Sequence, residues 1–231
     1  YTGPQRAFMS CADPIAVWRD GNQLGKSLCL AADLIHACRG TNPFAPAAHR
    51  PPIQAIVIGV SLEQMLALMK ALWQLVPKNE IDPRNGFEPG RGLTGKPPRL
   101  VFVRGPGRGS VINIATYRQG PTRVAGQTLH RVTMDEPPPE RMYGEVVPRL
   151  MRLGGWLRIG MTPTPDMPPQ EWLAKLVRDG DVREFDLVAV IQDLDADADV
   201  AAHRGLPLDG DRNRVVVGNR AAVGEHGHGV R

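Results

Sequence analysis

A segment near the start of the chain has the composition of a loop that holds a phosphate chain. GNQLGKS, residues 21–27, lies between an apolar run at Pro14–Arg19 and a helical pattern that continues to about Cys38. Backbone N–H groups of a glycine turn, aimed by a helix N-terminus, can bind phosphate oxygens. Lys26 can then reach the β and γ phosphates of ATP, and the Ser27 hydroxyl can bind Mg²⁺. The candidate ATP-binding residues are therefore Gly21, Asn22, Gln23, Leu24, Gly25, Lys26 and Ser27.

This segment departs from the usual phosphate-loop pattern at one position. In G-x-x-x-x-G-K-[ST] the first glycine would fall at residue 20, which is Asp20, and Gly21 follows one place later. The alternative interpretation is an ordinary helix N-terminus with a capping turn. The apolar strand before the segment and the helix after it favour the phosphate loop.

A second candidate site is an acidic pair at the end of an apolar strand, in VTMDE at residues 132–136. Carboxylates are costly near a core unless they bind a cation or water. In P-loop ATPases such an aspartate holds the Mg²⁺ shell and the next glutamate polarises the attacking water, which assigns these roles to Asp135 and Glu136. The alternative is an acidic helix start, because a helix follows Pro137–Pro139. Paired with the phosphate loop, the carboxylates predict ATP hydrolysis with Mg²⁺ as the cofactor.

The elements that must position these residues are short apolar runs alternating with helical patterns. Such alternation is typical of an α/β domain around a mostly parallel sheet. RGPGRG at 104–109 predicts a hairpin turn between two strands, because it opens no helix. Besides Pro14–Arg19, strands are expected at Ala55–Val60, Leu100–Arg104, Ser110–Tyr117, Arg131–Met134, Trp156–Met161 and Phe185–Ile191.

Helical periodicity predicts three further helices: one after Ala55–Val60, one from about Glu140, and one over Pro169–Arg178. For the first two, the expected apolar stripes are Leu62, Met65, Leu66, Met69, Trp73 and Val76, and then Tyr143, Val146, Val147, Leu150 and Met151.

The segment Pro77–Pro98 is rich in proline and glycine and is expected to be a loop excursion, either functional or mobile. Its basic residues are candidates for contact with DNA or with a neighbouring subunit, although an ordinary solvated loop has the same composition. These residues are Lys78, Arg84, Arg91 and Lys96.

Composition limits the class of protein. The chain has 231 residues, 42% of them hydrophobic, and a net charge of +4, a modest basic excess that suits an anionic partner but is common. No window approaches 18 uninterrupted apolar residues, so no membrane segment is expected. Three cysteines without paired spacing predict reduced, mostly buried thiols of a cytosolic protein. Residues 192–231 contain no aromatic residue and predict a disordered tail, which leaves 1–191 as one ATPase domain.

Taken together, GNQLGKS, HRVTMDEPP and RIGMTPT resemble the ATPase domain of tailed-phage large terminases. The flanking PQRAF and INIATYRQG are also similar to that family, and the resemblance extends from about Tyr1 to Arg178. It implies a P-loop NTPase fold of the RecA/ASCE type, with a mostly parallel sheet, flanking helices, a β-hairpin insertion and a flexible C-terminal tail. Nothing after Arg178 resembles the nuclease half of such proteins, so the chain is interpreted as an excised domain, a split motor subunit or a truncated product.

The resemblance also implies roles for single residues. Gln5 matches the glutamine that contacts the adenine edge, and Thr162, with Thr164 behind it, matches the motif that couples γ-phosphate loss to movement. An arginine finger is expected, but the residue at the family's position is Ala125. Arg123 is the favoured finger, and Arg118 and Arg149 are the alternatives.

The implied activity is ATP hydrolysis that drives double-stranded DNA into a procapsid in the host cytoplasm. The implied partners are DNA, the portal protein, the small terminase subunit and further copies of the chain in a ring, with no membrane. Two alternatives remain open. One is a helicase-like translocating ATPase, which normally needs a second core domain. The other is a non-hydrolysing assembly or DNA-binding module, against which the intact Lys26, Ser27, Asp135 and Glu136 argue.

Overall fold

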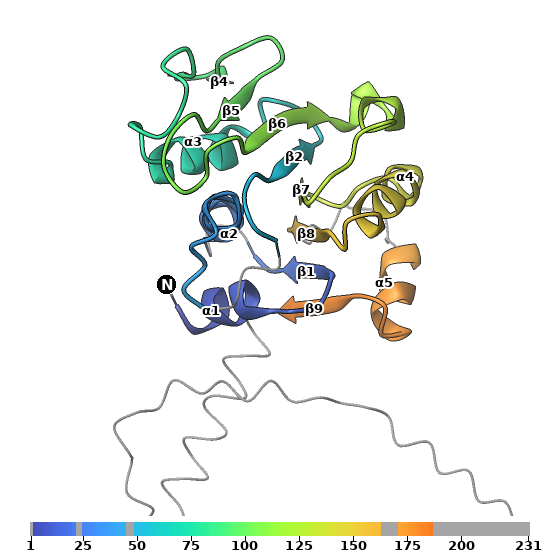
Figure 1. Ribbon diagram of the computed structural model, residues 1–231. Helices are drawn as coiled ribbons and strands as arrows, with labels where there is room; N and C mark the ends of the chain where they lie inside the picture. The colour runs from blue at the N-terminus through green and yellow to red at the C-terminus, as the bar shows by residue number, and fades with distance from the viewer. Residues whose placement is uncertain (1, 22–24, 45–48, 163–170, 187–231) are drawn as a thin grey trace, which may run out of the picture.

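A mostly parallel sheet runs through the molecule (Figure 1). The structure is a computed structural model that describes residues 2–21, 25–44, 49–162 and 171–186. The strands of this sheet are β1 (Ile15–Arg19), β2 (Gln54–Gly59), β5 (Arg99–Val101), β6 (Val111–Thr116), β7 (Arg131–Asp135), β8 (Trp156–Met161) and β9 (Arg183–Asp186). The order across the sheet is β5-β6-β2-β7-β8-β1-β9. All neighbouring strands are parallel except β5, which is antiparallel to β6.

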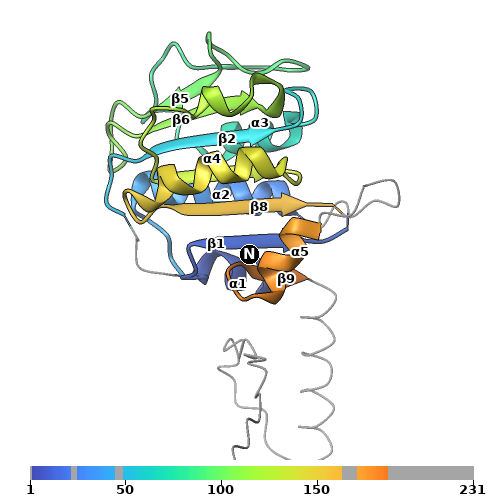
Figure 2. The same cartoon turned by 90° about the vertical axis from the view of Figure 1, so that its right-hand side faces the viewer.

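Helices cover both faces of this sheet (Figures 1 and 2). One face carries α1 (Gly3–Ser10), α2 (Lys26–Arg39) and α3 (Leu66–Leu75), and the other carries α4 (Glu140–Met151) and α5 (Glu171–Arg178). Two short 3₁₀ helices, η1 (Tyr117–Gln119) and η2 (Pro121–Arg123), follow β6. Among the described residues, no helix combines the length and apolar character that crossing a membrane requires.

The two-sided cover explains the continuously apolar strands, because alternate residues of one strand enter different cores. In β2, Ala55 and Val57 belong to the core beneath α2 and α3, whereas Ile56 and Ile58 belong to the core beneath α4. The predicted α/β fold with a mostly parallel sheet is confirmed, and so is the antiparallel pair on either side of RGPGRG.

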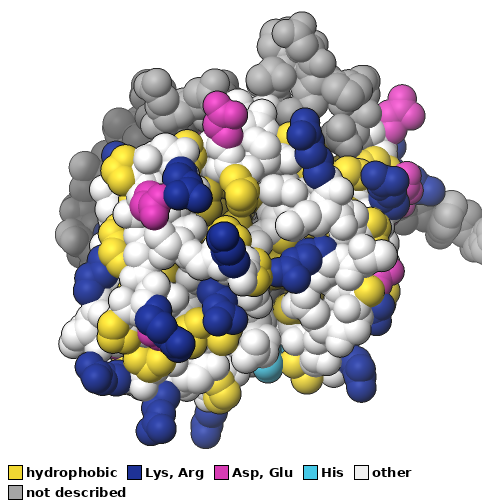
Figure 3. Space-filling view, turned by 90° about the horizontal axis from the view of Figure 1, so that it is seen from above, with side chains coloured by type: hydrophobic (Ala, Val, Ile, Leu, Met, Phe, Trp, Pro, Cys, Tyr) yellow, Lys and Arg dark blue, Asp and Glu magenta, His cyan; other side chains and the backbone are white. Residues whose placement is uncertain are grey.

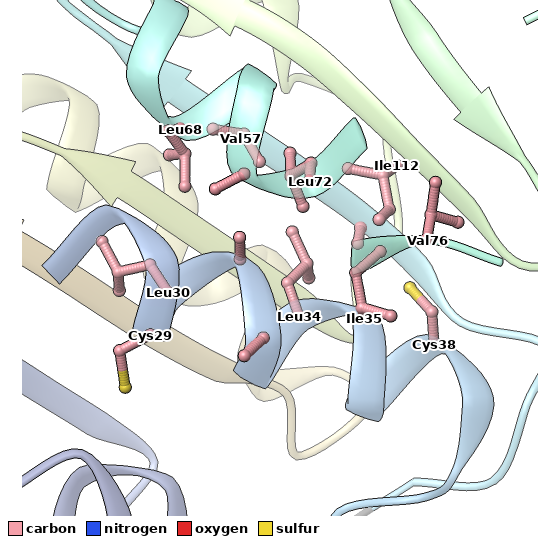
Figure 4. Packing of buried hydrophobic residues seen from close by; sticks show 14 of the residues in the cluster. Cys29, Leu30, Leu34, Ile35, Cys38, Val57, Leu68, Leu72, Val76 and Ile112 are labelled. Atoms are coloured by element: carbon pink, nitrogen blue, oxygen red, sulfur yellow. The ribbon is translucent and has the colours of Figure 1, made fainter. Parts of the chain in front are cut away.

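The helix after β2 buries most of the predicted stripe, with Met65, Met69 and Val76 buried, and it buries two further leucines beside that stripe. Leu62 is 39% exposed and lies before the helix, which starts at Leu66. Leu68 and Leu72, absent from the predicted stripe, are fully buried because α3 packs on α2 as well as on the sheet. Figure 4 shows Leu72 opposite Leu34 of α2, and Leu68 further along toward Leu30.

Pro77–Pro98 is largely turns and irregular chain, as predicted, but it also carries a short sheet that was not predicted. It contains a two-stranded sheet of β3 (Phe87–Glu88) and β4 (Gly92–Leu93). Leu93 is buried against the core that contains α3. Gly92, at φ +87°, lies so close to Met69 that a Cβ would approach the Met69 Cε to 2.3 Å, which explains the glycine. The sequence reasoning saw the glycines as turn residues only.

A cluster of buried charged residues lies between α2 and the amino-terminal halves of strands β7 and β8. Asp33 of α2 lies 3.5 Å from Arg131 of β7. Arg158 of β8 is 1% exposed and donates hydrogen bonds to the carbonyls of Cys11 and Asp13, both at 3.0 Å. Trp156 packs against both guanidinium groups. Since uncompensated buried charges are costly, these contacts constrain how α2 sits on the sheet.

Smaller differences concern the ends of elements. In α4, Met142 is buried in place of the expected Met151, which is 74% exposed. The last described strand, Arg183–Asp186, overlaps the predicted strand Phe185–Ile191 at its start, and residues 187–191 lie outside the described part of the chain. The three cysteines are buried and form no disulfide, as predicted. The predicted tail at 192–231 lies outside the described residues.

Candidate active site

The candidate residues come from three strands that end at the same edge of the sheet. The loop after β1 carries the phosphate-loop segment, Glu136 follows β7, and Thr162 follows β8. Strand β8 lies between the other two, with Arg19 beside Met161 and Asp135 beside Gly160. Figure 2 shows β8 pointing to this edge, at the right of the view. The carboxyl ends of parallel strands are where α/β sheets bind ligands.

Gly25 begins α2 in a conformation that other residues rarely adopt. Its φ is +82°, in the left-handed region, and its N-cap position leaves the first amides of α2 without helical partners. A Cβ at Gly25 would lie 2.8 Å from the Gln5 side-chain nitrogen. Two independent constraints, backbone angle and space, therefore require glycine here. Asn22, Gln23 and Leu24 lie outside the described residues.

Asp20 occupies the position where the phosphate-loop pattern has glycine. Its side chain stabilises the start of this loop. Its carboxylate is buried and accepts hydrogen bonds from the Gly21 amide at 2.7 Å and the Trp18 indole at 3.3 Å. A glycine would offer neither contact. At this position a side chain, rather than a glycine backbone, stabilises the turn. From the sequence alone, Asp20 was noted only as a mismatch.

The Lys26 ammonium group contacts the backbone directly after β1. Its Nζ donates to the carbonyls of Asp20 at 2.7 Å and Gly21 at 2.5 Å. Burial lowers the pKa of Lys26, and the nearby carboxylates of Asp20, Glu136 and Asp135 oppose that shift. The predicted phosphate-loop lysine and the predicted acidic pair are therefore brought within electrostatic range of each other.

The Asp135 carboxyl is largely shielded from water at the end of β7. The pKa of Asp135 is raised from 3.8 to about 6, first by burial and then by the neighbouring charge of Glu136, while Lys26 acts in the opposite direction. A carboxylate that is costly to ionise in the bare protein is suited to bind a cation, because the cation restores the lost solvation.

We expect Asp135→Asn to stabilise the metal-free protein. The folded state holds the Asp135 proton up to about pH 6 and the unfolded state only to about pH 4. The folded state therefore loses stability as the pH rises between these values, and the loss persists at neutral pH. Removing the charge should raise the free energy of unfolding at pH 7.5 by about 1–3 kcal/mol.

Urea unfolding with a chelator present, at pH 7.5 and near pH 4, measures this effect. The gain should shrink toward pH 4, where Asp135 is protonated in both states. The matched control is Asp179→Asn, at an exposed position after α5. Equal or lower stability of Asp135→Asn at pH 7.5 would contradict the assigned burial cost.

Glu136 adopts a left-handed backbone conformation, with φ at +70°. Such conformations cost about 1–3 kcal/mol for residues other than glycine and are found at functional sites. The Glu136 amide donates to the Gly160 carbonyl at 2.8 Å, and its Oε2 accepts from the Thr162 amide at 3.0 Å. The Tyr117 hydroxyl donates to the Glu136 carbonyl at 2.7 Å. The carboxylate of Glu136 is thereby held next to the end of β8.

Two of the residues whose roles the family resemblance implies, Gln5 and Thr162, lie in the described part of the candidate site. Gln5 is buried in α1 with its amide nitrogen against Gly25, while its Oε1 accepts from the Thr2 amide at 2.9 Å. Thr162 is buried directly after β8 and contacts Glu136 through its backbone. Thr164 lies outside the described residues. Their roles in adenine binding and coupling stay predictions.

The three candidate finger arginines have different surroundings. Arg149 is paired with Glu145 on α4, and Arg118 of η1 is exposed. Arg123 ends η2, and its backbone carbonyl accepts a hydrogen bond from the Gln127 side-chain Nε2 at 2.6 Å. The Arg123 Nε is buried without a hydrogen-bond partner among the described residues. Arg123 lines an open hollow together with Pro97, Gln119, Thr122, Ala125 and Gln127.

Sequence reasoning missed Tyr117, which contacts the acidic pair from another strand. The INIATYRQG segment was noted for its resemblance, but no role was given to its tyrosine. Nothing in the spacing of Tyr117 and Glu136 indicates that they meet, because β2 lies between β6 and β7 in the sheet. An apolar strand ending in a tyrosine next to a turn was the one available signal.

The sheet order and the helices on both faces define an α/β domain, and comparisons with solved structures show which known domains share this fold. No family profile and no curated protein sequence matches the chain. The large terminase ATPase domain of Thermus phage P74-26 matches with a TM-score of 0.53 and 17% identity, over 79% of this chain and 78% of that domain. A mutant of that domain matches with a TM-score of 0.53 and 19% identity, over 79% of both chains.

The large terminase of a thermophilic bacteriophage, solved in complex with ADP, matches with a TM-score of 0.54 and 12% identity. The match covers 79% of this chain and 43% of that one, so the chain spans less than half of the longer protein. The chain therefore has the fold of large terminase ATPase domains. Identities this low establish a common fold, and the activity has to be argued from the site.

Proposed function

We propose that this chain binds and hydrolyses ATP, as the motor domain of a viral DNA-packaging terminase. The observation that carries the proposal is the meeting of Lys26, Asp135 and Glu136 at one edge of the sheet, next to the glycine-started helix α2. A cation for the phosphates, a carboxylate for the metal and a carboxylate for the water are the parts that phosphoryl transfer requires. The ADP complex of a structural neighbour supports the nucleotide.

Mg²⁺ fits the residues present. Magnesium in nucleotide sites is held by one or two protein oxygens together with phosphate and water oxygens. Ser27, in the first turn of α2, and Asp135, with its desolvated carboxyl, would hold it. The ion would supply charge neutralisation between the β and γ phosphates. Glu136 would orient the water and accept its proton, and Lys26 would bind the phosphates.

Replacement of Lys26 by alanine tests the nucleotide site. The phosphates would lose a positive charge that backbone amides do not replace, so affinity for Mg-ATP should fall by about tenfold or more, a difference of at least ~1.4 kcal/mol. Titration with a fluorescent ATP analogue measures this. Lys70→Ala, on the exposed surface of α3, is the matched control. Parental affinity in Lys26→Ala would rule out the phosphate-loop assignment.

Double-stranded DNA is the proposed polymer, and a basic surface supports it. Four exposed residues follow the edge strand β5 and its connections: Lys96, Arg99, Arg104 and Arg108, here called the basic edge. Among the described residues none of the four has a carboxylate within ion-pairing distance. Figure 3 shows that Lys and Arg side chains gather on this end of the molecule. Unpaired cations in such an array can displace counterions from a DNA backbone.

The structure changes which residues should be tested for DNA contact. Of the four basic residues predicted within Pro77–Pro98, Arg84 is paired with Asp82 and Arg91 with Glu88. Lys78 donates to the carbonyl of Val76 at the end of α3. Only Lys96 of the four belongs to the basic edge, and the other three have local partners.

Charge reversal of the basic edge should weaken DNA binding and its salt dependence. At 50 mM salt we expect the Kd for a blunt duplex to rise about tenfold or more, and the slope of log K against log salt to lose about 3–4 units. Fluorescence anisotropy across a salt series measures both. The control reverses Arg50, Arg152, Lys175 and Arg178, four exposed residues elsewhere. Equal losses in the two variants would assign the effect to net charge alone.

The remaining partners follow from the same proposal. A packaging motor works in the host cytoplasm as a ring of identical subunits, docked on the portal protein and supplied with DNA by the small terminase subunit. A helicase-like ATPase and a non-hydrolysing assembly module are the alternatives. Turnover of ATP by the purified chain, with and without duplex DNA, separates the hydrolysing candidates from the inactive one.

A further inference from the structure

The backbone of Glu136 is held in a conformation that its sequence position disfavours. Glu136 precedes Pro137, and residues before proline prefer extended conformations with negative φ. Its φ of +70° makes it the one residue other than glycine with a positive φ in the described part of the chain. A side chain with this backbone persists only where its surroundings impose it.

Three hydrogen bonds impose it, and each uses a different polar group of Glu136. The amide donates to the Gly160 carbonyl, the Oε2 accepts from the Thr162 amide, and the carbonyl accepts from the Tyr117 hydroxyl. The first two partners are backbone groups of β8 and its end, which are fixed by the pairing of β7 with β8. Tyr117 is therefore the only side chain among the three partners.

The side chain of Tyr117 is buried and reaches Glu136 from a part of the sheet that is not next to β7. Tyr117 follows β6, while Glu136 follows β7, and β2 separates these strands, so the tyrosine side chain crosses the end of β2. It is 9% exposed and packs in the core beneath α4. Burial, followed by the charges of Asp135 and Glu136, raises the pKa of Tyr117 well above its ordinary value, so the hydroxyl stays a donor.

We propose that Tyr117 is a positioning residue for Glu136. By holding the Glu136 carbonyl, its hydroxyl maintains the left-handed backbone that aims the carboxylate at the position of the attacking water. This inference rests on the proposed function, in which Glu136 accepts the proton of that water. It assigns β6 a part in the chemistry, since the strand delivers the hydroxyl across the sheet edge.

Tyr117→Phe removes the hydroxyl and keeps the ring. Because a misplaced general base slows the chemical step without weakening nucleotide binding, kcat for ATP should fall roughly ten- to a hundredfold. The Kd for Mg-ATP and the melting temperature should stay near the parental values. Steady-state kinetics, nucleotide titration and thermal unfolding supply the three measurements. Tyr143→Phe is the matched control, because its ring packs on Trp172 of α5.

Glu136→Gln separates the failure of this inference from failure of the proposed function. If Glu136→Gln turns over ATP at the parental rate, the proposed function fails and Tyr117 has nothing to position. If Glu136→Gln is inactive while Tyr117→Phe keeps the parental kcat, the positioning role alone is overturned. A joint loss of kcat, nucleotide affinity and melting temperature in Tyr117→Phe would assign Tyr117 to packing and also overturn the proposal.

Discussion

Glu136→Gln should retain Mg-ATP and lose hydrolysis. Water is a poor nucleophile, and a carboxylate one hydrogen bond away both orients it and accepts its proton. The amide has the same shape, and its oxygen can still accept the Thr162 amide that contacts Oε2. Loss of a general base typically costs on the order of 10²–10⁴ in rate. Phosphate release and equilibrium ATP binding, measured on the same preparation, should therefore separate.

The neighbouring carboxylates provide the controls. Asp135→Asn should weaken Mg-ATP binding as well as turnover, because it removes charge from the metal shell. Glu140→Gln, at an exposed position in the first turn of α4, should leave both quantities unchanged. Near-parental hydrolysis by Glu136→Gln would demote the acidic pair to a helix start. The base would then be sought at Glu140 or at Glu145, which is paired with Arg149.

The fold class could be predicted because its determinants are local. Apolar runs such as Ala55–Val60 are strands close to the predicted bounds, since a strand buried on both faces needs no pattern beyond continuous apolarity. Periodicity was less reliable for α3, where Leu68 and Leu72 are buried by a second helix. Contacts between helices depend on the tertiary arrangement, and a one-helix pattern does not contain it.

Some residues of the candidate site could also be predicted from the sequence, and others could not. Lys26, Asp135 and Glu136 could be chosen because Lys26 starts the helix after one strand and the acidic pair ends another, and parallel strands bring their carboxyl ends together. The function of Asp20 as a partner for the Gly21 amide was missed, since the expected pattern has no side chain there. The Tyr117 contact was also missed, because strand order decides which ends are neighbours and the sequence does not state that order.

Arg123 is the residue that we expect to act on ATP bound by a neighbouring subunit. The transferred phosphoryl group develops charge that a guanidinium can stabilise, often from an adjacent chain. Arg149 is engaged by Glu145, whereas Arg123 borders an open hollow and has no ion-pair partner among the described residues. Turnover per subunit should therefore rise with protein concentration in the parent and stay flat in Arg123→Ala. Arg118→Ala, on exposed η1, should behave as the parent.

Mixing two inactive variants tests whether Arg123 acts across a subunit interface. Arg123→Ala keeps an intact nucleotide site without a finger, and Glu136→Gln keeps the finger without a working base. Each alone should be nearly inactive, because a finger arginine contributes about 10³–10⁵ in rate. Mixed in equal amounts, they should regain turnover, since Glu136→Gln subunits can supply Arg123 to the intact sites of their neighbours. If Arg123 acts within its own chain, each variant lacks one essential group for every site, and the mixture should remain as inactive as its components.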